Sequence, residues 1–161
     1  MSTTTYSATG TKASAPRLNY AKAAPAAFKA MLALQATVNA SGLDATLLNL
    51  VKLRASQING CAFCIDMHVR DAKALGETDE RLYLLDAWRE VDLYTEREQA
   101  ALEWTERMTR LAGAPVDDAA FAAARAQFTE EELANLTLAL VAINGWNRFN
   151  VGFRTPPGFG G

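Results

Sequence analysis

The sequence predicts an all-α protein that folds as a single helical domain. Apolar residues recur at spacings of three and four along most of the chain, and no stretch alternates convincingly between polar and apolar residues as a strand would. The pattern Thr-x-x-Glu, which opens helices through reciprocal hydrogen bonds, occurs at Thr95 with Glu98 and at Thr129 with Glu132. A chain of 161 residues has the size of one domain, and we expect about six to seven helices in it.

Two helices are expected before residue 60. The first begins at Asn19 and ends at Gly42, with Pro25 in its first turn or at a kink. Asp44 can cap the second helix, because its carboxylate can accept from the free N–H groups of the first turn. The dipeptide Asn59-Gly60 then ends this helix.

A third helix, expected at residues 61–75, has one chemically distinctive face. Helical spacing places six residues on it: Cys61, Cys64, Ile65, His68, Ala72 and Leu75. Ala62, Asp66, Val69 and Lys73 point away, and Gly76 ends the helix.

The second half of the chain predicts four more helices. They run from Thr78 through Trp88, from Thr95 to Leu111, from Asp117 to Phe128, and from Thr129 onward. The last of these is apolar on nearly every side as far as Ile143, which is typical of a helix covered by neighbours or by another subunit.

Composition divides the chain into three parts and excludes several classes of protein. Residues 1–18, rich in Ser, Thr, Ala and Gly, are expected to form a flexible arm, followed by a helical domain at 19–157 and a short tail at 158–161. The net charge of −2 offers no basic field for nucleic acid. The strongly apolar stretch 136–143 is far shorter than the roughly 20 residues that cross a bilayer, and residues 1–10 lack the pattern of a secretory signal. We therefore expect a cytoplasmic protein without membrane or nucleic-acid partners.

The two cysteines and the single histidine of the chain lie within eight positions, from Cys61 to His68. Residues three apart on a helix have β-carbons about 5–6 Å apart, so Cys61 and Cys64 can form a disulfide. His68 lies one turn after Cys64 and can take its proton, directly or through water. Because the thiolate is the nucleophile, this group of residues predicts reversible dithiol–disulfide chemistry.

Other interpretations of the motif remain open. Cys61 would lie at the helix start, where free N–H groups favour a thiolate, so the residues alone do not decide which sulfur reacts first. The cysteines could be small apolar core residues, or Cys61, Cys64 and His68 could bind zinc with a fourth carboxylate ligand from elsewhere. No G-x-G-x-x-G or Walker-type loop is present, and we expect neither an organic cofactor nor a metal.

The segment from Arg54 to His68, Arg-Ala-Ser-Gln-Ile-Asn-Gly-Cys-Ala-Phe-Cys-Ile-Asp-Met-His, followed by Arg70-Asp71-Ala72, resembles the core of the AhpD-like alkyl hydroperoxidases. These belong to the carboxymuconolactone decarboxylase superfamily. The similarity extends over about residues 17–157 and includes Arg81 to Leu85, Trp88 to Glu90, Tyr94 to Glu98 and Asn144 to Arg148.

The resemblance implies an all-helical subunit that forms homo-trimers or homo-hexamers and reduces organic hydroperoxides or hydrogen peroxide. It also implies that Cys64 attacks the peroxide, that His68 relays a proton, and that Cys61 resolves the intermediate. An external dithiol then resets the pair.

The sequence departs from the family pattern at Asn49, twelve residues before Cys61, where the relay ordinarily has a glutamate. An amide cannot accept a proton or stabilise an imidazolium as a carboxylate does. We therefore expect weak peroxidase turnover, with a thiol–disulfide exchange or redox-responsive protein as the alternative. Asn49 could also lie on a solvated helix face while another acid serves the relay. A lactone decarboxylase is a third possibility, although that chemistry has no use for two cysteines.

Overall fold

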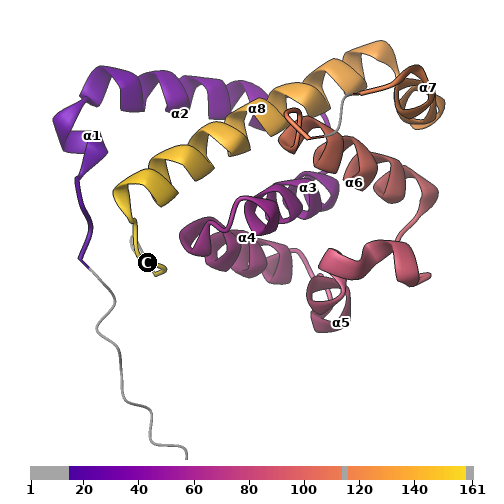
Figure 1. Ribbon diagram of the computed structural model, residues 1–161, viewed down its shortest axis with the longest axis horizontal. Coiled ribbons are helices and arrows are strands. Elements are labelled where there is room, and N and C mark those ends of the chain that lie inside the picture. The colour runs from indigo at the N-terminus through magenta and orange to yellow at the C-terminus, as the bar shows by residue number, and fades with distance from the viewer. Residues whose placement is uncertain (1–14, 114–115, 159–161) are drawn as a thin grey trace, which may run out of the picture.

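The computed structural model describes residues 15–113 and 116–158, which form nine helices and no strand (Figure 1). The all-α, single-domain prediction is confirmed. In chain order the elements are α1 (Tyr20–Ala23), α2 (Pro25–Asn39), α3 (Ala45–Ile58), α4 (Ala62–Ala74), α5 (Asp79–Tyr83), the 3₁₀-helix η1 (Leu85–Glu90), α6 (Glu96–Thr109), α7 (Asp118–Gln127) and α8 (Glu130–Phe153).

The expected number of six to seven helices was too low, because two of the predicted helices are each divided. Ala24, with φ −138° and ψ 69°, separates α1 from α2, and Pro25 then opens α2. Leu84, with φ −91° and ψ 3°, separates α5 from η1 within the stretch predicted as one helix. Each break is a change of one residue's dihedral angles, which hydrophobic periodicity does not register.

The predicted helix starts are confirmed. Asp44 accepts from the backbone N–H of Leu47 at 2.9 Å, and Thr78 accepts from that of Arg81 at 3.3 Å. Both capping boxes have the two reciprocal hydrogen bonds that the Thr-x-x-Glu pattern predicts.

Of the proposed arm, residues 1–14 lie outside the described residues, as do 159–161 of the proposed tail. Arg17, near the end of the arm, donates its backbone N–H to the carbonyl of Phe153 at 2.9 Å and its guanidinium to that of Gly152 at 3.1 Å. The domain boundaries stay a prediction.

Helix α3 lies at the centre of the fold and contacts α4, α6, α8 and η1 (Figure 1). It supplies Val51 and Ala55 to one apolar cluster, shared with α8, and Leu50 and Leu53 to a second, shared with η1 and α6. Because α3 is enclosed by these neighbours, three of its polar side chains are buried as well: Lys52, Arg54 and Ser56.

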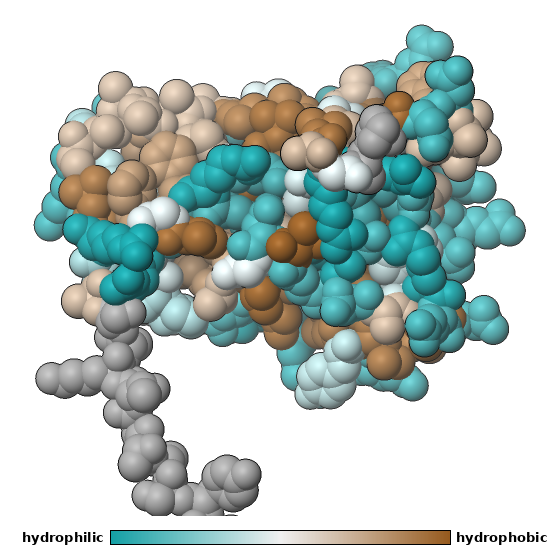
Figure 2. Space-filling model, viewed as in Figure 1, coloured by the Kyte–Doolittle hydropathy of each residue, from teal (hydrophilic) through white to brown (hydrophobic). Residues whose placement is uncertain are grey.

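Helix α2 packs along α8 at the edge of this bundle (Figure 1). Figure 2 shows mostly apolar side chains along the top of the same view, where these two helices run, and hydrophilic ones at the right. Leu32 of α2 and Val141 of α8 are about half exposed. None of the described helices combines the length and the apolar character that crossing a membrane requires.

A buried ion pair joins α3 to α6. Arg54 donates to Glu106 at 2.8 Å, and both side chains are less than 10% exposed. Glu106 also accepts from the indole of Trp88 at 3.1 Å and from Arg89 at 2.8 Å. Burial alone would raise the pKa of Glu106, but the hydrogen bonds from Arg89, Arg54 and Trp88 outweigh it and hold that pKa below its usual range.

Replacing Glu106 with Gln should lower the free energy of unfolding by about 3 kcal/mol, because Arg54 loses its buried charge partner. The matched control is Glu103→Gln: Glu103 also pairs with arginines, but its side chain is 29% exposed, and the expected loss is below about 1 kcal/mol. Urea denaturation at pH 7 measures both. Equal losses of unfolding free energy in the two variants would show that the buried pair stabilises the fold no more than the exposed one.

Candidate active site

The turn between α3 and α4 positions the two sulfur atoms. Asn59 ends α3, and Gly60 has φ +65°, a left-handed conformation that a side chain would strain. The chain therefore reverses at once, and Cys61 becomes the N-cap of α4. Its sulfur accepts the backbone N–H of Cys64 at 3.3 Å.

The predicted disulfide is confirmed: Cys61 and Cys64 are bonded, with their Cα atoms 5.3 Å apart. The predicted inward face of α4 is also confirmed for Cys64, His68 and Ala72, which are each at most 5% exposed. Leu75, which follows the helix, is instead about half exposed.

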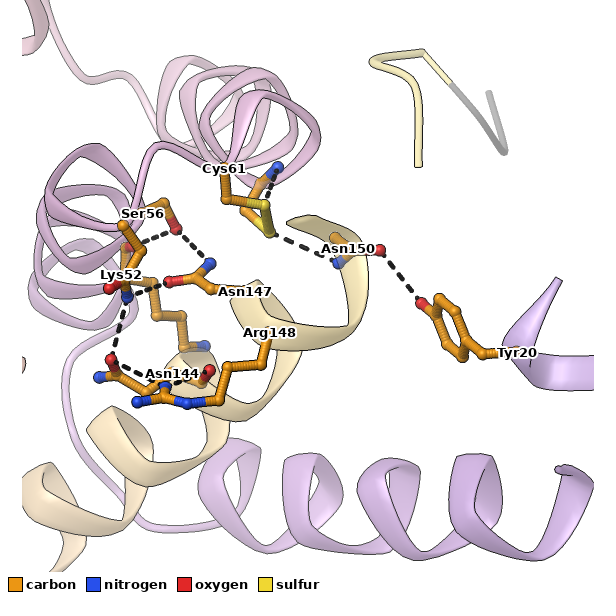
Figure 3. The surroundings of a disulfide bond; sticks show 10 residues. Tyr20, Lys52, Ser56, Cys61, Asn144, Asn147, Arg148 and Asn150 are labelled. Carbon is orange, nitrogen blue, oxygen red and sulfur yellow. Dashed lines mark hydrogen bonds between the residues drawn. A yellow bond between two sulfur atoms is a disulfide. The ribbon is translucent and has the colours of Figure 1, made fainter. Parts of the chain in front are cut away.

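Helix α8 brings a polar side chain to the disulfide. Asn150 places its amide nitrogen 3.5 Å from the sulfur of Cys64, and its carbonyl accepts the hydroxyl of Tyr20 at 3.2 Å (Figure 3). In this arrangement the amide oxygen faces the Tyr20 hydroxyl and the amide nitrogen faces the sulfur. Asn150 therefore presents a hydrogen-bond donor to Cys64, which would favour a thiolate there.

A second set of amides holds α8 against the end of α3 (Figure 3). Asn59 donates to Asn144 at 2.9 Å and to Asn147 at 2.8 Å, and Asn147 donates to the hydroxyl of Ser56 at 3.1 Å. Ser56 in turn donates to the carbonyl of Lys52 at 2.7 Å. Buried side chains that satisfy one another in this way fix the relative position of two helices.

The structure brings Asn49 to His68. Nδ1 of the imidazole lies 3.3 Å from Oδ1 of Asn49, and the amide nitrogen of Asn49 donates to the carbonyl of Ala45 at 3.2 Å. Because the amide nitrogen is committed to a carbonyl, the amide oxygen must face the imidazole. Nδ1 then carries the proton, and Nε2 is left as a bare acceptor.

This acceptor is unusual among the described residues, since Nε2 of His68 is their one buried side-chain nitrogen or oxygen without a hydrogen-bond partner. Burial, and then the positive charge of Lys52, lower the pKa of His68 to about 3. The imidazole is therefore neutral at cellular pH. A carboxylate oxygen of Asp71 lies 3.8 Å from Nδ1, although this side chain is about half exposed.

A cavity of about 960 Å³ opens beside these residues. Cys64, His68, Asn49, Lys52 and Asn150 all line it, whereas Cys61 does not. The remaining wall is largely apolar and comes from α1, α2, α3, α4 and α8. The sulfur that the cavity reaches is thus that of Cys64.

Sequence reasoning named Cys61, Cys64, His68 and Asn49 but missed Lys52, Asp71, Asn150 and Tyr20. Lys52 lies one turn after Asn49 and Asp71 one turn after His68, so helical spacing was the available signal for these two. No local signal could identify Asn150 or Tyr20, because tertiary packing alone brings them to α4.

Within the ranges 15–113 and 116–158, no group of three or more His, Cys, Asp and Glu side chains is arranged to hold a metal ion. The described side chains therefore do not form the zinc site considered above.

Comparison with known proteins identifies the family of the chain. Residues 25–107 match the model of the carboxymuconolactone decarboxylase family. The uncharacterised protein YdfG of Bacillus subtilis is 41% identical over 135 residues, which cover 84% of this chain and 92% of that protein.

Solved structures share the fold. A protein of unknown function from Agrobacterium tumefaciens, with a suggested role in antioxidant defence as an AhpD protein, is 48% identical with a TM-score of 0.87, and the match covers 89% of this chain and 98% of that one. A variant of the debrominase Bmp8, in complex with 2,3,4-tribromopyrrole, is 18% identical with a TM-score of 0.75, and the match covers 84% of this chain and 72% of that one. At this identity the similarity shows a shared fold and nothing further. With the thiol pair, its histidine and these matches in agreement, the chain belongs to the carboxymuconolactone decarboxylase family, as an AhpD-like member.

Proposed function

We propose that this protein is a thiol-dependent peroxidase that reduces organic hydroperoxides or hydrogen peroxide through a cycle of Cys61 and Cys64. The observation that carries the proposal is that Cys64 and His68 line one cavity, while a nitrogen of that histidine is a buried acceptor without a partner. A buried acceptor left unpaired costs free energy, and a base for a reacting thiol explains its presence.

In the first step, His68 takes the proton of the Cys64 thiol on Nε2, and the amide of Asn150 donates to the resulting thiolate. The thiolate attacks the peroxide oxygen and the O–O bond breaks, which leaves a sulfenic acid on Cys64 and an alkoxide. The protonated imidazole returns its proton to the alkoxide, so that an alcohol departs.

In the second step, the thiol of Cys61 condenses with the sulfenic acid to give the disulfide and water. One sulfur of an external dithiol then attacks Cys64, the sulfur that lines the cavity, to form a mixed disulfide, which the second sulfur of the dithiol resolves. Cys61 leaves as a thiolate, which is favoured because its sulfur accepts an N–H at the start of α4. The low pKa expected for Cys61 therefore matters when the disulfide is reduced, whereas Cys64 acts earlier, when it attacks the peroxide.

The wider setting of the reaction rests on the family resemblance. We propose the cytoplasm as its compartment, where an external dithiol is available, and a homo-trimer or homo-hexamer as its assembly.

A thiol–disulfide exchange protein is the second candidate, and the amide of Asn49 favours it. An imidazole that faces an amide oxygen gains less stabilisation of its charged form than one that faces a carboxylate. Peroxide reduction needs His68 to charge and discharge, whereas attack by an external dithiol does not.

Counting free thiols after one equivalent of cumene hydroperoxide separates these functions. A peroxidase should lose two thiols for each peroxide consumed. Cys64→Ser, which lacks the attacking thiol, should not consume the peroxide. Loss of thiols only with a disulfide oxidant would support exchange and refute the peroxidase. Turnover of a lactone with no change in thiols would refute both.

Asn49→Glu should raise the steady-state rate of peroxide reduction by about tenfold, because a carboxylate beside Nδ1 stabilises the imidazolium that forms when Cys64 ionises. Asn49→Gln is the matched control, with the same length and no charge. A rate that stays unchanged or falls in the Glu variant, or that rises equally in the Gln variant, would contradict the proposed relay.

His68 should also make stability depend on pH. Its pKa is about 3 in the folded protein against a usual 6.5, so below pH 6.5 the unfolded chain binds a proton that the folded chain does not. The free energy of unfolding should therefore fall as the pH drops from 6.5 towards 3. Urea denaturation of wild type and His68→Gln over this range should show a shallower fall in the variant. Parallel curves would mean that His68 is not a buried neutral base.

A further inference from the structure

The cavity beside Cys64 is larger than a small peroxide needs. Its volume of about 960 Å³ is near the upper end of the range for sites that enclose small organic ligands. Much of its wall is apolar or aromatic and includes Phe28, Leu32, Leu48, Phe63, Met67 and Trp146. Such a wall favours an extended apolar chain or ring system.

One charged side chain in this wall lacks a partner. Lys52 is only 9% exposed, and within the described residues no carboxylate lies within the 4 Å of an ion pair from its ammonium group. Burial lowers the pKa of Lys52 against the opposing effect of Asp71, the nearby acid. Arg54, two residues further along the same helix, is also buried but is paired with Glu106 and Asp86.

The two cations of α3 therefore differ in what they do for the folded chain. Arg54 has the anions that a buried charge requires, whereas Lys52 bears the desolvation cost without an ion-pair partner. A charge on a largely buried side chain that lines a cavity is complementary to an anion that comes from outside the chain.

We propose that the cavity binds an apolar hydroperoxide that carries a carboxylate, such as a fatty-acid hydroperoxide, and that Lys52 receives the carboxylate. The inference rests on the proposed peroxidase function, and it names the substrate class. Lys52 and Cys64 line the same cavity, so a hydroperoxide whose carboxylate binds Lys52 can lie along the apolar wall with the O–O group on its chain beside Cys64.

Binding can be tested without turnover on the oxidised protein, by isothermal titration calorimetry with decanoate and with decan-1-ol. Wild type should bind decanoate at least about tenfold more tightly, the discrimination of a charge-assisted hydrogen bond. Lys52→Met should abolish this preference, and Lys52→Arg should keep it. Lys73→Met is the matched control, because Lys73 is exposed and pairs with Asp79; the preference should persist there.

The stability of Lys52→Met distinguishes a ligand-binding role for Lys52 from a structural one. Lys52→Met should raise the urea midpoint, because it removes a charge without an ion-pair partner from an apolar wall. A lower midpoint would show that Lys52 supports the fold, and would overturn the proposal. Equal affinity of wild type for both ligands would also overturn it, as would a preference that survives in Lys52→Met.

Two further outcomes separate this inference from the function on which it rests. If neither ligand binds, the cavity is closed or covered, for example by a second copy of the chain, and the inference fails whether or not the protein reduces cumene hydroperoxide. If decanoate binds through Lys52 but no peroxide is consumed, the carboxylate site stands and the peroxidase fails. If both hold, Lys52→Met should raise KM for a hydroperoxy fatty acid more than KM for its methyl ester.

Discussion

The reversal of the chain at Gly60 is the constraint on which the site depends. Only three residues separate the end of α3 from the start of α4, so Cys61 takes the N-cap position and Cys64 follows one turn later on the buried face. The same register places His68 one further turn along α4, next to Asn49 of α3. A side chain at residue 60 would strain this turn, and the relation between sulfur, imidazole and amide would change with it.

Helix α3 combines two tasks that usually exclude one another. It is the central packing element of the fold, yet it carries buried polar residues on more than one side. On the side facing α6, Arg54 is matched by the chain's own carboxylates and joins the helices. On the side facing the cavity, Lys52 and Asn49 are left to act on other groups. Residues of α3 that face α6 thus stabilise the fold, whereas those that face the cavity are available to a ligand.

What the sequence could predict was set by how local each feature is. Helix caps, the disulfide and the inward face of α4 follow from spacings of three and four residues, and they were found as expected except at Leu75, which is exposed. The break at Leu84 depends on one pair of dihedral angles and was not foreseen, whereas Pro25 had already marked a possible kink next to the break at Ala24. The cavity and the contact of Asn150 with Cys64 arise only when α8 packs onto α4, so no local pattern could reveal them.

The contacts of Tyr20 and Asn150 have a consequence for the order of assembly during synthesis. Tyr20, Cys64 and Asn150 span 130 positions, so a nascent chain that has just exposed both cysteines still lacks the helix that covers them. Until that helix leaves the ribosome, the thiols meet oxidants as those of an ordinary peptide would. The contact of Cys64 with Asn150, and through it with Tyr20, is therefore acquired late, when the last helix docks.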